Sequence, residues 1–273
     1  FANGHKKIKV GMITTLSGGG SGLGIDVRDG FLLAVKGDNH FEVIVKDDQR
    51  KPDIAVQIAD KMIQSDKVDV LTGIIWSNLA MAVVPTAVKQ GKALYAGISS
   101  YLPDATAESV EICKNHGFSP LTIHQPNYSM LNRWIENSLM DVCEKNGLGM
   151  IAFCPLFQGL LTDKYLNGIP DGSRASLQKS PLRKNEVSEQ NIRVIRELND
   201  HAVLRGQTLA QMALSWVLKD ARITSALVGA SSLSQIKDNV KSVEQTGFSS
   251  EELQKLDRIL AKINLPKSLW AQD

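Results

Sequence analysis

The sequence predicts an α/β fold in which strands of a parallel sheet alternate with helices. Apolar runs alternate with amphipathic stretches along the whole chain, which is the pattern of βα units. The 273 residues, 43% of them hydrophobic, suffice for one large domain or two small ones, with a core that needs no metal or disulfide. The formal net charge of +2 is not gathered into a basic patch, so we expect no nucleic-acid partner.

The apolar runs predict seven strands, and the amphipathic stretches predict the helices. The strands are expected over Ile8–Thr15, Phe41–Lys46, Val68–Ile75, Ala93–Ser99, Leu121–Gln125, Gly149–Cys154 and Ser225–Gly229. The helices are expected over Asp26–Val35, Asp53–Ser65, Leu79–Lys89, Ala105–Asn115, Ser129–Asn146, Ser188–Arg205, Thr208–Leu218, Leu233–Val243 and Ser250–Ile263. A long polar loop is expected over Leu166–Glu186, and loops of this kind often close over ligands.

Single residues and short motifs give only weak signals of chemistry. The glycine-rich stretch Leu16–Gly24 precedes a helix and could hold an anion, but it matches no complete phosphate-binding motif, so a flexible turn is favoured. His124 lies in an apolar run, which favours a core histidine, or one at the mouth of a barrel, over a catalyst. The cysteines Cys113, Cys143 and Cys154 have no CxxC spacing, so a zinc site is not expected.

The apolar runs are too short for a membrane span. No window reaches 18 consecutive apolar residues, and no apolar run follows the basic residues near Phe1. We therefore expect no membrane partner, no signal peptide and a cytoplasmic location.

Residues 93–273 resemble the aldo-keto reductases, in the branch that includes the potassium-channel β-subunits. The resemblance rests on six motifs in order, which are GISSY from Gly97, HQPNY from His124, FCPLFQGLLTDKY from Phe153, RASL from Arg174, AQMALSW from Ala210 and GASSLSQIKDN from Gly229. Enzymes of this family are TIM barrels that bind NADPH across their carboxyl-terminal face. The resemblance implies that this part of the chain is the cofactor-binding half of such a barrel.

The resemblance also implies which residues would contact NADP(H). Ser99, Ser100 and Gln125 would hold the carboxamide of the nicotinamide, and Phe153 would stack on its ring. The pyrophosphate path, the long loop and the adenosine end would be formed by Cys154, Leu156, Gln158, Lys164, Arg174, Gly229, Ser231, Gln235, Asp238 and Asn239.

Residues 1–92 resemble the N-terminal lobe of a type I periplasmic substrate-binding protein. The motifs are IKVGMITTLSG from Ile8, DGFLLA from Asp29, VIVKDDQ from Val43, VQIADKM from Val56 and VLTGIIWSN from Val70. That lobe is flavodoxin-like, so the resemblance implies a (βα)3 fragment with the strand order 2-1-3. By the same resemblance, Ser77 and Asn78 would contact a small carboxylate.

The two parts of the chain resemble unrelated families and meet near residue 92. This predicts an engineered chimera, built to test the recombination of flavodoxin-like and TIM-barrel fragments. We expect both parts to pack as one domain, in a closed or nearly closed TIM-barrel-like body. The alternatives are an open doubly wound sheet and a homodimer through a free strand edge.

The resemblance to the aldo-keto reductases predicts that the chain is not an enzyme. The reductases draw their catalytic Tyr, Lys, Asp and His from the first half of the barrel, and the strand ends at Thr14–Ser17, Lys46–Asp48 and Gly73–Ser77 hold no tyrosine. We expect no catalytic or metal-binding residues, and NADP(H) binding that is weak or absent. The alternatives are a residual NADPH-dependent aldehyde or ketone reductase and a weak binder of small carboxylates.

Overall fold

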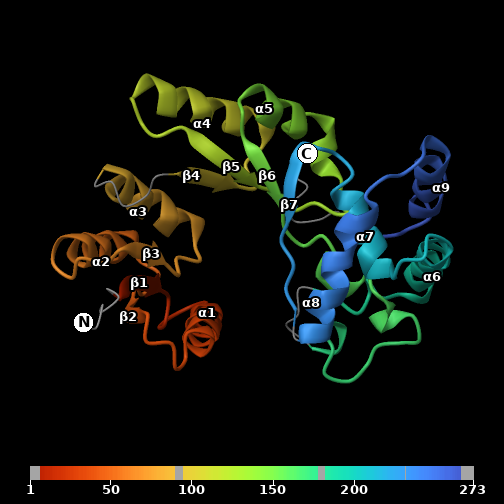
Figure 1. The fold of residues 1–273 in the computed structure, drawn as a ribbon, viewed down its shortest axis with the longest axis horizontal. Helices are drawn as coiled ribbons and strands as arrows, with labels where there is room; N and C mark the ends of the chain where they lie inside the picture. The colour runs from red at the N-terminus through yellow and green to blue at the C-terminus, as the bar shows by residue number, and fades with distance from the viewer. Residues whose placement is uncertain (1–6, 90–94, 178–181, 231, 266–273) are drawn as a thin grey trace, which may run out of the picture. The chain divides into compact units, whose positions relative to one another are not determined.

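The protein is described by a computed structural model that covers residues 7–89, 95–177, 182–230 and 232–265 (Figure 1). The chain divides into two compact units. Unit 1 comprises residues 1–96 and 113–120, and unit 2 comprises residues 97–112 and 121–273.

Unit 1 is a three-stranded parallel sheet with helices. Strand β1 (Ile8–Thr14) lies between β2 (Phe41–Asp47) and β3 (Val70–Thr72). The helices are α1 (Ser21–Ala34), α2 (Pro52–Gln64) and α3 (Ser77–Lys89). Helix α2 buries Ala55, Ala59, Met62 and Ile63. These residues lie on one face of the helix because they follow its repeat of 3.6 residues per turn. This face joins Ile13 and Val83 in the apolar core of unit 1.

Helix α1 begins at Ser21, five residues before the expected start at Asp26, and two glycines explain the difference. Gly20 adopts a left-handed conformation, with φ at 87°, at the N-cap position. Gly24 is buried, and a Cβ atom there would lie 2.0 Å from the carbonyl oxygen of Thr15. Part of the glycine-rich stretch is therefore a helix that packs closely against the end of β1.

Unit 2 is built on a four-stranded sheet of order β4-β5-β6-β7, in which β5, β6 and β7 pair in parallel. The strands are β4 (Ala96–Ser99), β5 (Leu121–Gln125), β6 (Gly149–Ala152) and β7 (Ile223–Ala226). The α-helices are α4 (Pro103–Asn115), α5 (Leu139–Lys145), α6 (Glu189–Leu204), α7 (Leu209–Val217), α8 (Leu233–Val240) and α9 (Ser250–Leu260). Short 3-10 turns are η1 (Trp134–Asn137), η2 (Phe157–Gly159), η3 (Asp163–Tyr165), η4 (Arg174–Ser176) and η5 (Lys241–Gln245).

Helix α7 is the centre of the apolar core of unit 2. Its side chains from Gln211 to Val217 are all buried, and it packs against α6, α8, η5 and β7. Thr208 closes a capping box with Gln211 at its start, which satisfies two backbone N–H groups that the helix leaves without partners. The cap therefore fixes the start of a helix whose remaining length is buried.

The prediction of one helix over Ser129–Asn146 is wrong. Ser129 and Asn132 exchange two backbone hydrogen bonds of 3.1 Å in a tight turn, and η1 and α5 follow as separate short elements. Serine and asparagine favour turns because their side chains compete for nearby backbone groups. Strand β7 begins at Ile223, before the expected Ser225, and the expected start of the fourth strand at Ala93 lies outside the described residues.

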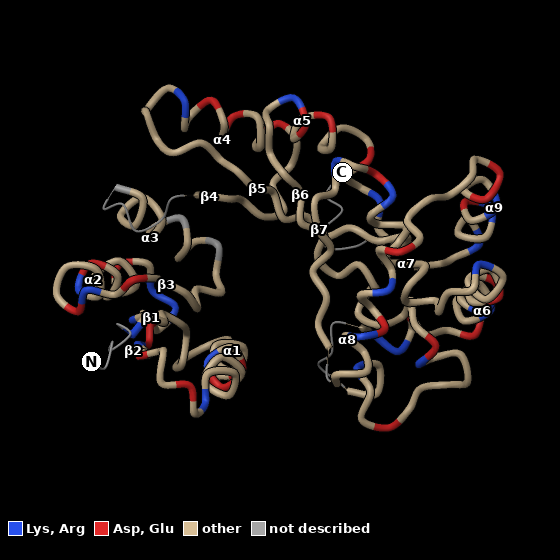
Figure 2. The backbone as a smooth tube through the Cα atoms, viewed as in Figure 1, with Lys and Arg blue, Asp and Glu red and all other residues tan. Residues whose placement is uncertain are grey.

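Charged side chains of both signs are interleaved along the helices. Figure 2 shows this along α2, α6 and α9, where lysine and arginine alternate with acidic residues. In the ranges that the structure covers, no helix combines the length and apolar character needed to cross a membrane. The same ranges contain no group of three histidine, cysteine or acidic side chains placed to hold a metal ion.

Candidate functional site

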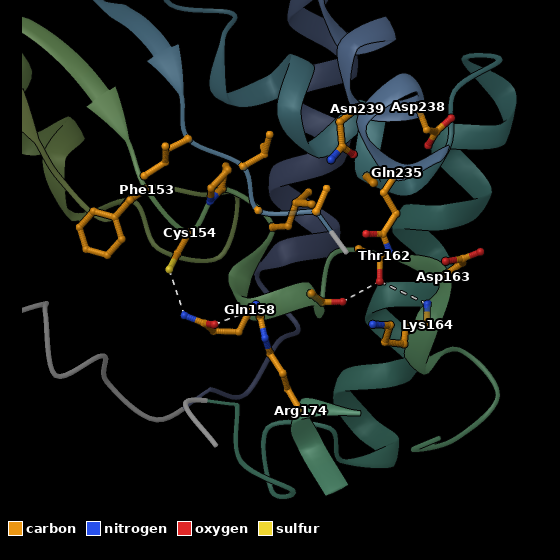
Figure 3. A pocket seen from close by; sticks show the side chains of 18 of the residues that line it. Phe153, Cys154, Gln158, Thr162, Asp163, Lys164, Arg174, Gln235, Asp238 and Asn239 are labelled. Atoms are coloured by element: carbon orange, nitrogen blue, oxygen red, sulfur yellow. Dashed lines mark hydrogen bonds between the residues drawn. The ribbon is translucent and has the colours of Figure 1, made fainter. Parts of the chain in front are cut away.

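A pocket of about 1170 Å³ lies in unit 2 beyond the carboxyl ends of β6 and β7 (Figure 3). Its lining comes from the segments that follow these strands, from η2, η3 and η4, from the start of α7 and from α8. This is the edge at which parallel α/β sheets bind ligands, because the connections at that end of the strands diverge and leave a crevice. Ten of the fourteen expected cofactor residues line it, namely Phe153, Cys154, Leu156, Gln158, Lys164, Arg174, Gly229, Gln235, Asp238 and Asn239.

The three residues expected to hold the carboxamide of the nicotinamide do not line this pocket. They meet one another at the ends of β4 and β5, where the hydroxyl of Ser99 donates to the carbonyl oxygen of Gln125 at 2.8 Å. The backbone N–H of Ser100 donates to the same oxygen at 3.1 Å. The fourteenth expected residue, Ser231, lies outside the described residues.

The loop after β6 holds its side chains in place by an unusual backbone. Cys154, Phe157 and Gln158 adopt left-handed φ angles of 55°, 45° and 57°. Each such residue other than glycine costs roughly 1–2 kcal/mol, so the surrounding structure has to fix it. Strained backbone of this kind gathers at functional sites more often than elsewhere, so the loop strengthens the assignment of the pocket.

A chain of hydrogen bonds orients the guanidinium of Arg174 at the edge of the pocket. The guanidinium of Arg174 donates to the Gln158 side-chain oxygen at 3.2 Å, and the Gln158 amide donates to the Cys154 sulfur at 3.0 Å (Figure 3). Burial raises the pKa of the Cys154 thiol, and the nearby Arg174 only partly opposes this. Cys154 therefore stays a neutral thiol at physiological pH.

The pocket is lined by two cations and by two carboxylates, those of Asp163 and Asp238, and among the described residues the cations are not paired with carboxylates. Lys164 and Arg174 line it, and neither forms an ion pair with a carboxylate in the described part of the chain. The carboxylate of Asp238 is already used, because it accepts hydrogen bonds from the Thr208 hydroxyl at 3.1 Å and the Gln211 amide at 2.7 Å. Anionic groups are therefore the favoured ligands.

Helix α8 adds a second anion-binding feature. Ser232 caps the helix by accepting the backbone N–H of Gln235 at 3.3 Å, and Ser234 and Gln235 line the pocket. The start of a helix carries partial positive charge and backbone N–H groups without partners inside the helix.

The sequence analysis missed the other nine lining residues, which are Pro155, Gly159, Thr162, Asp163, Ala210, Leu227, Val228, Ala230 and Ser234. Thr162 begins η3, accepts the backbone N–H of Lys164 at 3.3 Å and donates to the carbonyl oxygen of Gly159 at 2.7 Å. A threonine followed by an aspartate is a known signal for a helical start, so this residue could have been found. The apolar residues after β7 carry no such signal.

Comparisons with known proteins agree on one family. A sequence model described as "Aldo/keto reductase family" matches residues 53–261. An L-glyceraldehyde 3-phosphate reductase of Escherichia coli O157:H7 is 50% identical over 188 residues, covering 67% of this chain and 54% of the relative. A putative voltage-gated potassium channel subunit beta of Schizosaccharomyces pombe is 32% identical over 178 residues, covering 63% and 52%. The chain spans about half the length of the curated relatives it matches.

A solved structure shares the fold. The crystal structure of the thermostable aldo-keto reductase Tm1743 in complex with the inhibitor epalrestat superposes with a TM-score of 0.55 at 19% identity. The superposition covers 94% of this chain and 82% of that one.

These findings overturn the prediction of an engineered chimera. The family match runs across residue 92, where two unrelated parts were expected to join, while residues 1–52 lie outside the matched range. The prediction of a protein without enzymatic function is overturned with it, because the matched family and the bacterial relative are named as reductases. The small-carboxylate alternative rested on the resemblance of residues 1–92 to a periplasmic substrate-binding protein, whereas the matched family, the bacterial relative and the solved structure are named as reductases.

Proposed function

Because the chain belongs to the aldo/keto reductase family, with its α/β, TIM-barrel-like fold, we propose that it is an oxidoreductase that binds NADP(H) and reduces a carbonyl compound. The observation that carries this proposal is the pocket beyond β6 and β7, in which ten of the expected cofactor residues converge. The name of the bacterial relative supports a small phosphorylated aldehyde as the substrate.

The residues present suit a dinucleotide that carries several phosphate oxygens. Lys164 and Arg174 supply cationic donors without carboxylate partners among the described residues, and Gln235 lies beside the start of α8. A pocket of about 1170 Å³ is large for a single small metabolite and suits an extended cofactor.

The residues of this chain bind and orient, and the cofactor supplies the redox chemistry. When bound, NADPH supplies a hydride to the carbonyl carbon of the substrate. Lys164 and Arg174 would hold its phosphate groups, and Gln158 would keep the Arg174 guanidinium turned toward them. Phe153 offers an aromatic face at the end of β6, on which a flat ring can stack.

The expectation that this chain contains no catalytic residues stays a prediction. No tyrosine or histidine of the described residues lines the pocket. Cofactor binding and turnover are therefore two separate questions, and the experiment has to answer each.

The first experiment is a titration of NADPH with purified protein, followed by cofactor fluorescence. We expect saturable enhancement for the wild type and at least tenfold weaker binding for Arg174→Ala. Arg193→Ala is the matched control, because Arg193 is exposed on α6, where it pairs with Glu189, and does not line the pocket. An unsaturable signal in the wild type would contradict the proposal that the pocket binds NADP(H).

Turnover is measured as the loss of NADPH absorbance with L-glyceraldehyde 3-phosphate. We expect a rate that depends on enzyme concentration and falls in Arg174→Ala. A flat trace beside saturable NADPH binding would reject the reductase activity and keep the cofactor site.

The finer expectations on assembly are also proposals. They are closure into one nearly closed body, with an open sheet or a homodimer through a free strand edge as alternatives, a cytoplasmic location and no nucleic-acid partner. Size-exclusion chromatography with light scattering distinguishes monomer from dimer, and a dimer that dissociates when a proline is placed in β7 would favour the strand-edge alternative.

A further inference from the structure

Unit 2 contains a second pocket, of about 210 Å³, that shares no lining residue with the first. It lies beside Trp216, whose buried ring packs against Tyr128 with the ring centroids 5.5 Å apart. Two cations stand over the same indole. The Arg133 guanidinium carbon is 5.0 Å from the ring centroid, and the Lys219 ammonium nitrogen is 3.5 Å from it. A rigid aromatic surface thus holds both cations at the pocket.

The guanidinium of Arg133 is paired with two carboxylates. It binds Glu136 at 2.8 Å and Asp257 at 2.6 Å. A guanidinium has five N–H donors, so spare donors remain after these contacts.

Arg222 is paired in the same way. It binds Asp220 at 2.7 Å and Asp141 at 2.6 Å. Both arginines line the pocket and retain unused N–H donors, while the carboxylates around them are already occupied by cations.

Lys219 differs from the two arginines because it has no carboxylate partner in the described residues. Its ammonium donates to the hydroxyl oxygen of Tyr128 at 3.4 Å, and that hydroxyl donates its own proton to Glu136 at 2.7 Å. An ammonium has three N–H donors, so two of them have no acceptor among the described residues. Burial lowers the pKa of Lys219, an effect that Glu136 only partly opposes, and a bound anion would raise this pKa again.

We propose that this pocket is a binding site for a phosphate group, with Lys219 as the principal ligand and Arg133 and Arg222 beside it. The lining carries three cations and two carboxylates, and two further carboxylates, those of Asp257 and Asp141, bind the arginines from outside the lining, so the site offers an excess of N–H donors and no excess of positive charge. A group with two negative charges and several acceptor oxygens uses such an excess of donors better than a carboxylate does. The ligand is either free phosphate or the phosphate of a small metabolite.

Calorimetry tests the proposal in the Arg174→Ala background, which weakens phosphate binding in the first pocket. Inorganic phosphate is titrated at constant ionic strength. We expect saturable binding that weakens at least tenfold in Lys219→Gln and stays unchanged in Lys255→Gln, which removes an exposed lysine of α9. No saturable heat, or equal binding in both variants, would overturn the proposal. The same titration with glycerol 3-phosphate identifies the source, because tighter binding indicates a metabolite and weaker binding indicates free phosphate.

A measurement on the wild type covers the case in which Lys219→Gln does not fold. The protein is acetylated briefly with an amine-reactive ester, with and without phosphate, and each lysine is quantified by peptide mass spectrometry. We expect phosphate to reduce the labelling of Lys219 at least fivefold and to leave Lys255 unchanged. Equal labelling of Lys219 in both conditions would overturn the proposal.

Discussion

At the scale of single residues, two buried tyrosines of unit 2 have very different polar environments. The hydroxyl of Tyr128 donates to the Glu136 carboxylate at 2.7 Å, and burial beside this carboxylate raises the pKa of Tyr128. The hydroxyl of Tyr165 only accepts the backbone N–H of Ala175, at 3.4 Å. A short bond to a charged group is stronger than a long bond between neutral groups.

These two tyrosines give a matched pair of substitutions. We expect Tyr128→Phe to lower the free energy of unfolding by roughly 1.5–3 kcal/mol, because it removes a hydrogen bond to a charged acceptor. Tyr165→Phe is expected to lower it by less than about 1 kcal/mol, because the lost bond is long and neutral. Urea unfolding measures both values. Equal losses would show that the Glu136 bond contributes nothing beyond packing.

His124 predicts a dependence of stability on pH. Burial lowers its pKa in the folded state to about 4, from an ordinary value of 6.5. Between these two values the unfolded chain binds more protons than the folded one, so stability falls as the pH drops from about 6.5 to about 4.

The loss attributable to His124 amounts to at most about 3 kcal/mol across this window. We expect His124→Gln to flatten the dependence of the urea midpoint between pH 7 and pH 4.5. His116→Gln, which changes an exposed histidine, is expected to keep the wild-type slope. A wild-type slope in His124→Gln would refute this role.

At the scale of elements, helices α7 and α8 are joined at one carboxylate. Asp238 of α8 accepts from Thr208 and Gln211, the two residues that also cap the start of α7. One side chain therefore fixes the helix that lines the first pocket to the most deeply buried helix of unit 2.

We expect Asp238→Ala to lower the free energy of unfolding by roughly 1–3 kcal/mol, because the buried Gln211 amide loses its carboxylate acceptor at 2.7 Å and keeps the backbone carbonyl oxygen of residue 238 at 3.1 Å. The binding of NADPH should weaken as well, since α8 is no longer held at the pocket. Asp163→Ala is the control for stability alone, because Asp163 is exposed and also lines the pocket, and we expect a change in stability within about 0.5 kcal/mol. Denaturant unfolding and the NADPH titration measure both effects, and equal losses of stability in the two variants would contradict the argument.

At the scale of the whole molecule, the two units differ in the size of their cores. Among the described residues, the buried apolar cluster of unit 1 contains seven side chains, and the cluster of unit 2 contains 29. Local stability rises with the number of buried apolar contacts, so unit 1 should open more easily.

Hydrogen exchange followed by mass spectrometry tests this difference. We expect peptides from β1 to β3 to exchange at least about tenfold faster than peptides from β5 to β7, under conditions in which the protein stays native. Similar protection in both units would show that they open as a single cooperative body.

The sequence predicted what depends on local pattern and missed what depends on distant contacts. Strand β5 has the predicted bounds, Leu121–Gln125, because its apolar run ends at a proline. The helix expected over Ser129–Asn146 failed because a local turn interrupts its apolar spacing.

The two pockets also show that contacts between residues far apart in the sequence could not be predicted. Ordered motifs in the sequence predicted most of the first pocket's lining. The hydrogen bonds from Ser99 and Ser100 to the carbonyl oxygen of Gln125 could not be predicted, because they depend on how β4 and β5 lie beside each other. The second pocket has ion pairs between Arg133 and Asp257 and between Arg222 and Asp141, which no spacing in the sequence connects.

The three thiols described above make the protein suitable for site-directed labelling without mutation. Cys143 is fully buried, and burial raises its pKa to about 11, so a maleimide dye at neutral pH leaves it untouched. Cys113, partly accessible at the end of α4, takes the first label. Burial also raises the pKa of Cys154, which lines the first pocket, so a brief reaction at neutral pH places a single fluorophore on Cys113, a residue that does not line the pocket and leaves it open to a ligand.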